Sequence, residues 1–300
     1  MAGAVLIANP FATGVTERKL AEVQAVLRPL GELETLLTRR RGHATELARE
    51  ACAAGCESIF VFSGDGTSNE VLNGIEPGYD VRLGFIPGGG TSVLPRALGL
   101  PRDALAAARR LRDAERDGST RRISLGRVNG RRFAFNAGLG FDAEAVRRFD
   151  ALGREDGGKR PGDLRFLLMV AEMLWDHRFR YEAVAELAGA GPVAFAIACN
   201  CHVLTYVGGH ALRIAPLAQF QLGLDVVAPP EVPRSAVPRL AGYVFSGDER
   251  LRGDVHYLHD VDRAELRCFR PLPLQADGED LGDVEQVVFE SERDAVTVLV

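Results

Sequence analysis

The sequence predicts an α/β domain followed by an antiparallel β domain, and three observations lead to this fold class. Residues 1–120 alternate short apolar runs with helical periodicity, which is the pattern of a parallel sheet covered by helices. From Arg121 onward the chain becomes rich in strand-like segments. Asn129 and Gly130 lie between two alternating apolar stretches, which is a strong signal for a hairpin. We therefore expect domains at 1–122 and 123–292, with the last strand, 293–300, returning to the first domain.

The first domain is expected to hold four strands and the helices between them. Each expected strand is a short run rich in apolar residues: 4–8, 32–37, 58–62 and 82–87. The expected helices lie at 15–28, at 43–54 and from about residue 68. Gly55 and Gly99 follow helical stretches and are typical helix stops.

The second domain is expected to consist mainly of strands. They fall at 122–128, 131–141, 179–187, 193–199, 222–227, 264–269 and 272–276, with helices near 163–175 and 233–241. The segment 153–162 is polar and rich in glycine, so we expect a mobile surface loop there.

Composition limits the classes of function. The 300 residues are 46% hydrophobic and carry a formal net charge of -5, so no global positive field attracts nucleic acid, which we exclude as a partner. No run of about eighteen apolar residues occurs, so we expect no transmembrane segment. Five cysteines, an odd number, favour a reducing, cytoplasmic compartment. Cys199 and Cys201 are too close together, without a second ligand pair, for a structural zinc site.

The segment 59–75 carries the clearest chemical signal. An apolar strand leads into Ser63-Gly64-Asp65-Gly66-Thr67, and a helix is expected to start directly after it. Glycines let the backbone approach a ligand, and the amides at a helix start favour phosphate. An aspartate in such a turn repels phosphate unless it holds a metal or takes a proton. A plain β-turn explains Asp-Gly but not the polar residues that follow.

This segment resembles the signature GGDGTxNEVxNG of the diacylglycerol kinase catalytic domain, shared by bacterial lipid kinases and, more loosely, by sphingosine and ceramide kinases. The sequence here is SGDGTSNEVLNG, with Ser63 in place of the first glycine. Further similarities extend over most of the chain: Asn9-Pro10 after the first strand, Thr38 after the second, FNAGLGFDAEAV at 135–146 and Asp277-Gly278-Glu279.

The resemblance implies a two-domain fold, an α/β domain like those of NAD kinases and phosphofructokinases plus a β-sandwich. It also implies that ATP and a lipid meet in a cleft between the two. The residues that would surround ATP are Asn9, Pro10, Phe11, Ala12, Thr13, Thr38, Ser63, Gly64, Asp65, Gly66, Thr67, Ser68, Asn69, Gly89, Gly90 and Thr91, with Glu70 and Asn73 in support.

The resemblance also assigns the chemistry to three carboxylates. Glu279 would be the general base, or would share that role with Asp65 through Mg²⁺ and water. Asp65 would be the metal ligand, and Asp142 would lie near the acceptor hydroxyl, although an N-cap is the plainer interpretation of Asp142. Phosphoryl transfer needs positioning and charge neutralisation more than covalent chemistry, which suits such a set.

One loop departs from the family pattern P-x-GTxNDxAR. Residues 87–96 read PGGGTSVLPR, which without gaps places Gly90 at the threonine, Ser92 at the asparagine and Val93 at the aspartate. A shift of one residue restores Gly90-Thr91 as the Gly-Thr pair. The departure bears on ATP affinity more than on the fold.

Several alternatives stay open at this point. The acceptor could be soluble, as in NAD kinases, or the chain could bind nucleotide or lipid without catalysis. The lipid itself, a diacylglycerol or a sphingoid base, is not readable from the sequence. The family leads us to expect transient contact with the membrane surface and a homodimer. Trp175, Met169, Met173 and Phe179 could line an acyl pocket, but an apolar helical face is more often core.

Overall fold

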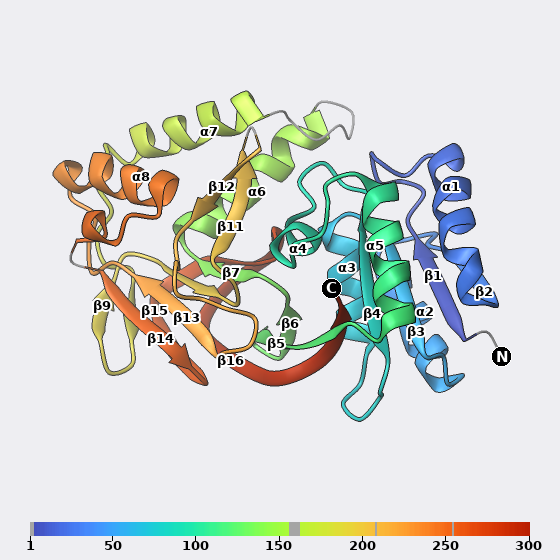
Figure 1. The fold of residues 1–300 in the computed structure, drawn as a ribbon. Coiled ribbons are helices and arrows are strands. Elements are labelled where there is room, and N and C mark those ends of the chain that lie inside the picture. The colour runs from blue at the N-terminus through green and yellow to red at the C-terminus, as the bar shows by residue number, and fades with distance from the viewer. Residues whose placement is uncertain (1–2, 156–162, 208, 254) are drawn as a thin grey trace. The chain divides into compact units, whose positions relative to one another are not determined.

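The computed structural model describes residues 3–155, 163–207, 209–253 and 255–300. The chain divides into two compact units. The first unit comprises Met1–Leu125 with Arg293–Val300, and the second comprises Gly126–Glu292. In Figure 1 the chain runs from blue at the amino terminus to red at the carboxyl terminus. The two-unit fold of an α/β part and an antiparallel β part, predicted from the sequence, is confirmed.

The first unit is built on a parallel sheet in the order β16-β4-β3-β1-β2. Its strands are β1 (Ala4–Ala8), β2 (Leu33–Leu37), β3 (Ser58–Ser63), β4 (Arg82–Pro87) and the end of β16 (Glu279–Leu299). All residues of β1 and β3 are buried, which explains why these strands read as continuous apolar runs rather than alternating ones.

Helices cover both faces of this sheet. They are α1 (Glu17–Leu27), α2 (His43–Ala53), α3 (Asp65–Gly74), α4 (Val93–Ala97) and α5 (Ala104–Asp117), with a 3₁₀ turn at Arg28–Leu30. Side chains of α1 and α5 share a core cluster with Leu6, Phe60 and Ile86. Thr16 and Asp103 cap the starts of α1 and α5 by accepting backbone N–H bonds, which fixes where these helices begin.

The order of the strands places a topological switch point between β1 and β3. The chain leaves β1 toward β2 on one side, and it leaves β3 toward β4 on the other side. Ligands of open α/β sheets bind outside the carboxyl ends of the strands at such a point. The loops that begin at Asn9 and Gly64 flank it.

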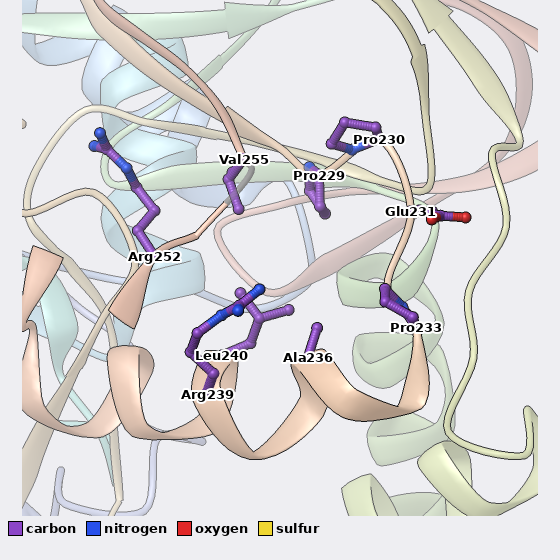
Figure 2. Close-up of a pocket in the computed structure, with 9 residues that line it drawn as sticks. All are labelled: Pro229, Pro230, Glu231, Pro233, Ala236, Arg239, Leu240, Arg252 and Val255. Atoms are coloured by element: carbon purple, nitrogen blue, oxygen red, sulfur yellow. The ribbon is translucent and has the colours of Figure 1, made fainter. Parts of the chain in front are cut away.

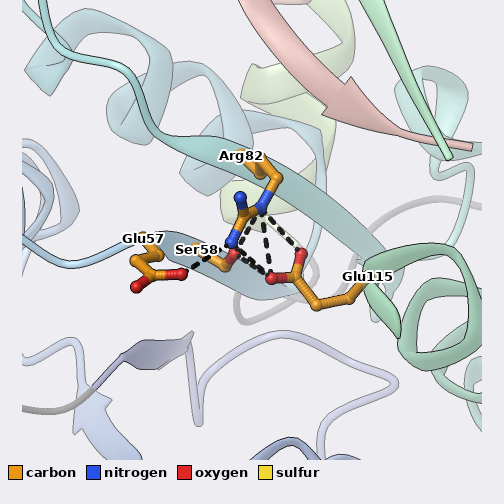
Figure 3. A network of polar contacts seen from close by, with 4 residues as sticks. All are labelled: Glu57, Ser58, Arg82 and Glu115. Atoms are coloured by element: carbon orange, nitrogen blue, oxygen red, sulfur yellow. Dashed lines mark hydrogen bonds and ion pairs between the residues drawn. The ribbon is translucent and has the colours of Figure 1, made fainter. Parts of the chain in front are cut away.

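An ionic network ties together the opposite, amino ends of β3 and β4. Arg82 opens β4 and donates to Glu115 on α5 at 2.7 Å, to Ser58 at the start of β3 at 3.1 Å and to Glu57 at 3.1 Å (Figure 3). Ser58 in turn donates to Glu115 at 2.7 Å. The network therefore holds the register of the two strands whose other ends carry the glycine-rich loops.

The second unit is an antiparallel sheet whose main path is β14-β13-β10-β7-β15-β16. β15 pairs with β7 along one part of its length and with β8 along another, so the sheet branches around a shared core. The strands are β5 (Thr120–Val128), β6 (Arg131–Phe133), β7 (Asn136–Leu139), β8 (Ala185–Leu187), β9 (Gly191–Val193), β10 (Ala196–Cys199), β13 (Leu224–Ala228), β14 (His256–Val261), β15 (Arg263–Ala276) and β16, with a separate ribbon of β11 (Val203–Val207) and β12 (His210–Arg213).

Three helices accompany this sheet: α6 (Phe141–Glu155), α7 (Asp163–Asp176) and α8 (Val237–Ser246), with 3₁₀ turns at Arg234–Ala236 and Glu249–Leu251. Of the loop predicted at 153–162, residues 153–155 form the end of α6, and 156–162 lie outside the described residues. The described part of the chain contains no helix long and apolar enough to cross a membrane.

The structure corrects three predictions about elements. α3 begins at Asp65 rather than near residue 68, because an acidic side chain in the first turn suits the helix dipole. Of the strand predicted at 179–187, only Ala185–Leu187 forms, and Tyr181 makes an isolated bridge to Val232. The two strands predicted at 264–269 and 272–276 are one strand, β15.

Candidate active site

Three loops meet at the carboxyl edge of the parallel sheet in the first unit. Asn9, just after β1, donates from Nδ2 to Thr67 Oγ1 on α3 at 2.9 Å. Its Oδ1 accepts from the backbone N–H of Phe11, so Asn9 also shapes its own turn. Gly14 donates its N–H to Gly88 O at 2.8 Å, which joins the first loop to the one after β4.

Glycine permits the close approach of these loops. A Cβ on Gly14 would lie 2.7 Å from Gly88 O, and a Cβ on Gly89 would lie 2.8 Å from Gly64 Cα. Both distances are shorter than real contacts of a Cβ, so any side chain would push the loops apart. The glycines predicted to cradle a ligand therefore also hold the loops against one another.

Asp65 connects the second loop to the third. Its Oδ2 accepts the N–H of Val93 at 2.9 Å and its Oδ1 accepts the N–H of Leu94 at 3.0 Å, at the start of α4. Asp65 thus holds the altered loop in place, a role that the sequence did not predict.

Glu70 and Thr38 bring the end of β2 to the same edge. The carboxylate of Glu70 on α3 accepts the N–H of Gly42 at 2.9 Å and that of Ala44 at 3.1 Å, so it caps α2. Thr38 is buried and donates its N–H to Ala8 O, directly before Asn9. Asn73 donates to the backbone and side chain of Asn69 one turn earlier.

The loop after β4 has its own internal geometry. Ser92 adopts φ 48°, and its Oγ accepts from Gly89 N and donates to Gly89 O, each at 3.2 Å. Gly90 has open space where a side chain would begin. Ser63, which replaces a glycine of the family signature, buries a hydroxyl that has no hydrogen-bond partner among the described residues.

In the second unit, Asp277 and Gly278 form the turn between β15 and β16, with φ 49° and 78°. The buried Asp277 carboxylate accepts the N–H groups of Ala134, Phe135 and Asn136, at 2.6 to 3.2 Å. Asp277 therefore fixes the segment between β6 and β7 to the turn that precedes Glu279.

Asp142 belongs to a buried polar group centred on Gln275. Gln275 Nε2 donates to Asp142 Oδ2 and to Asn136 Oδ1, and Gln275 Oε1 accepts from Gly278 N at 2.9 Å. Desolvation raises the pKa of Asp142 to about 6, and the bond from Gln275 opposes that rise. A carboxyl with this pKa can accept or release a proton near neutral pH.

Glu279 begins β16 and forms an ion pair with Arg131 on β6. Its side chain is 25% exposed, so the carboxylate remains accessible to solvent. The turn is formed by Asp277 and Gly278, and Glu279 is the first residue of the strand that follows it.

The predicted residues thus gather into two sets. Within the first unit the structure brings together the segments 9–13, 63–69 and 89–91 with Thr38, and within the second it joins Asp142 to the turn before Glu279. Sequence reasoning missed Gln275, Asn136 and Arg131. Gln275 carried a signal, since it is a lone amide inside the apolar segment LPLQA.

A pocket in the second unit lies apart from these sets. A pocket of about 210 Å³ in the second unit is lined by residues of α8 and by prolines that follow β13, and it contains none of the predicted site residues. Figure 2 shows the Glu231 carboxylate directed away from Arg239 and Arg252. In the described ranges, no three His, Cys, Asp or Glu side chains cluster so as to hold a metal.

Comparison with known proteins agrees with this arrangement. Residues 3–128 match the model of the diacylglycerol kinase catalytic domain. A diacylglycerol kinase of Bacillus subtilis (strain 168) is 41% identical over 145 residues, which cover 47% of this chain and 46% of that protein. A diacylglycerol kinase of Staphylococcus haemolyticus (strain JCSC1435) is 37% identical over 119 residues, which cover 39% of this chain and 35% of that protein. The chain thus spans about half or less of the length of these relatives.

Solved structures match over nearly the whole chain. A crystal structure from Bacillus anthracis str. Sterne has a TM-score of 0.77 at 21% identity. The match covers 99% of this chain and 94% of the chain in that crystal structure. A second, of a diacylglycerol kinase from the same strain, has a TM-score of 0.71 at 19% identity, covering 99% and 96%. At these identities the likeness establishes the fold.

The fold defines the class, an α/β unit combined with an antiparallel β unit. Within that class, residues 3–128 are similar to the diacylglycerol kinase catalytic domain family. The family resemblance inferred from SGDGTSNEVLNG is confirmed.

Proposed function

We propose that this protein is a lipid kinase that transfers the γ-phosphoryl group of ATP to a lipid hydroxyl, with Mg²⁺ as cofactor. One observation carries the proposal. The residues matched by the kinase family place three glycine- or proline-marked loops at a switch point of the sheet, where Asn9, Asp65 and Gly88 tie them together.

The residues of the first unit suit a nucleotide. The amides at the start of α3, that of Gly66 among them, and those of Gly64 and Gly90 are the proposed backbone donors for phosphate oxygens. Mg²⁺ is usually held by one or two carboxylates together with substrate phosphates, and Asp65 is the carboxylate in the first turn of α3, beside the proposed phosphate donors. ATP supplies the phosphoryl group, and Mg²⁺ neutralises its charge.

The second unit supplies the carboxyls for the acceptor. The lipid hydroxyl must lose its proton as its oxygen bonds to phosphorus, and Glu279 is the proposed base that receives it. Asp142, with a pKa of about 6, would orient the acceptor hydroxyl by accepting a hydrogen bond. Gln275 fixes Asp142 relative to the turn before Glu279 and is a positioning residue.

The test is an assay of the purified chain with radiolabelled ATP and Mg²⁺. The acceptors offered are a diacylglycerol, a sphingoid base and NAD⁺. We expect label in a lipid, and no label with Glu279→Gln. Label in NAD⁺ alone would favour the soluble-acceptor alternative. Tight ATP binding without transfer to any acceptor would favour a non-catalytic nucleotide binder, the alternative that the departure at 87–96 raises.

Hydrogen exchange tests the nucleotide site separately. We expect ATP to slow exchange at 9–13 and 63–69 together, because phosphate contacts on one loop restrain the other through the Asn9 to Thr67 bond. Protection elsewhere, with both segments unchanged at saturating ATP, would refute this site.

A further inference from the structure

Helix α7 buries one face in the core of the second unit. Met169 and Met173 are buried and pack, with Phe166 and Val170, against residues of α6. Leu174 packs with Tyr181 in a neighbouring cluster. Of the residues considered for an acyl pocket, the two methionines are therefore core.

The same helix carries a second apolar face that the core does not cover. Leu168, Ala171 and Trp175 follow one another at i, i+3 and i+7, so they form a line along the helix, with Leu167 beside it. Trp175 is 73% exposed and Leu168 is 48% exposed. Neither belongs to a hydrophobic cluster of the described residues, although the Trp175 ring meets Phe179 edge-on at 6.1 Å. This exposed apolar face does not contribute to the hydrophobic core of the unit, and exposed apolar patches often mark interaction sites.

Arginines lie near both ends of this face although the whole chain is acidic. Arg165 lies in the first turn of α7, Arg178 lies two residues after its end, and Arg234 donates from Nε to Arg178 O at 2.7 Å. All three are exposed, and within the described ranges none forms an ion pair with a carboxylate. The helix carries three acidic residues, Asp163, Glu172 and Asp176, of which Asp176 pairs with Arg148 at 2.8 Å.

We propose that this face of α7, made of Leu167, Leu168, Ala171 and Trp175, is where the protein docks on an anionic lipid bilayer. The inference rests on the proposed function, since a lipid acceptor resides in such a bilayer. Tryptophan prefers the interface between water and hydrocarbon, and leucines enter the acyl boundary. Arg165, Arg178 and Arg234 are drawn to anionic headgroups. A second copy of the chain on this face would bring like charges together at a two-fold interface.

Trp175 is the only tryptophan in the sequence, so its fluorescence reports on this face directly. Vesicles of equal parts phosphatidylcholine and phosphatidylglycerol should shift its emission to shorter wavelength, and brominated acyl chains should quench it. Vesicles of phosphatidylcholine alone should bind much less. Leu168→Gln keeps the reporter and should weaken vesicle binding about tenfold. Phe269→Gln, which alters an aromatic side chain 59% exposed on β15, is the matched control and should bind normally.

The outcomes separate this proposal from the kinase proposal, because vesicle binding needs neither ATP nor turnover. Activity toward a short-chain diacylglycerol in solution should be equal in wild type and Leu168→Gln. An unshifted Trp175 with anionic vesicles overturns the docking face, whatever the kinase assay gives. A dimer by light scattering that Leu168→Gln converts to monomer would instead assign the face to self-association and would also overturn the proposal.

Discussion

The acidic side chains of the family-like motifs have different surroundings in the two units. In the first unit, Asp65 and Glu70 each accept two backbone N–H groups, and each fixes the start of a helix. In the second, Asp142 accepts from a single side-chain amide, and Glu279 pairs with the side chain of Arg131. Backbone amides cannot move away, whereas side-chain partners can. The comparison separates acidic groups held by backbone amides from acidic groups held by side chains.

Asp277 is the exception that sharpens this division. It stands in the second unit beside Glu279, yet three backbone amides surround its carboxylate. Position in a motif therefore does not reveal which role an acidic residue has, and the hydrogen-bond partners do.

The largest effect is expected from Glu279→Gln. If this carboxylate takes the proton of the acceptor, kcat should fall by about 10²- to 10⁴-fold while the Kd for ATP stays within error. The matched control is Asp280→Asn, since Asp280 pairs with Arg147 at 2.9 Å and has no proposed catalytic role. Normal turnover in Glu279→Gln would move the search for the base to Asp142 or Asp65.

Asp277→Asn tests the loop-holding role. Asparagine tolerates φ 49° but supplies one acceptor oxygen for three N–H groups, so the free energy of unfolding should drop by about 1.5 to 3 kcal/mol in urea denaturation. Asp283→Asn removes an ion pair from a side chain 50% exposed and should change stability by less than about 1 kcal/mol. Equal losses in both variants would contradict the assignment.

Asp142→Asn tests the proton-exchanging role through pH. The pKa of Asp142 is raised from 3.8 to about 6 in the folded chain, so the native state holds the proton between these values. The stability linked to that proton is present below about pH 4 and is lost as pH rises to 6. Relative to the asparagine variant, wild type should lose about 2 kcal/mol over this range. A difference that does not vary with pH would refute the raised pKa.

The smallest effect concerns the departure at 87–96. Gly90→Thr with Ser92→Asn restores the family-like residues. A Cβ at Gly90 meets nothing within 4 Å, and asparagine accepts the left-handed conformation of Ser92. One recovered bond to phosphate should tighten ATP binding about tenfold, measured by calorimetry. No gain would favour the shifted alignment, in which Thr91 already has this role.

Sequence patterns predicted the first unit more closely than the second. Strands of a doubly covered parallel sheet are buried on both faces, so 4–8 and 83–87 carry no charged residue, and the predicted ranges 4–8 and 82–87 match β1 and β4 in full. In the second unit, β15 is one strand although Phe269 and Arg270 are exposed in its middle, where its pairing with β16 shifts register. Local periodicity cannot reveal a strand that changes partners along its length.

The candidate site could be predicted only where a motif is contiguous. The contiguous motif SGDGTSNEVLNG predicted most of the candidate site residues in the first unit. The structure was needed to find Gln275, Asn136 and Arg131, because their partners are distant in the sequence. The spacing of residues along the chain does not indicate which side chains form such hydrogen bonds and ion pairs. For the same reason the sequence assigned Asp65 to ATP, metal and proton transfer and missed its two bonds to the start of α4.

The return of β16 to the first sheet has a consequence for how the chain folds. One edge of β4 pairs with β3, which precedes it closely in the sequence. The other edge of β4 pairs with Thr297 and Val298, which lie at the end of the chain. Until those residues emerge from the ribosome, β4 presents an open, apolar edge, and such edges template pairing with other chains. Leu299 also completes the core cluster that Leu6 begins. The unit made first is thus completed last, because its sheet lacks one strand until the end of the chain has been synthesised.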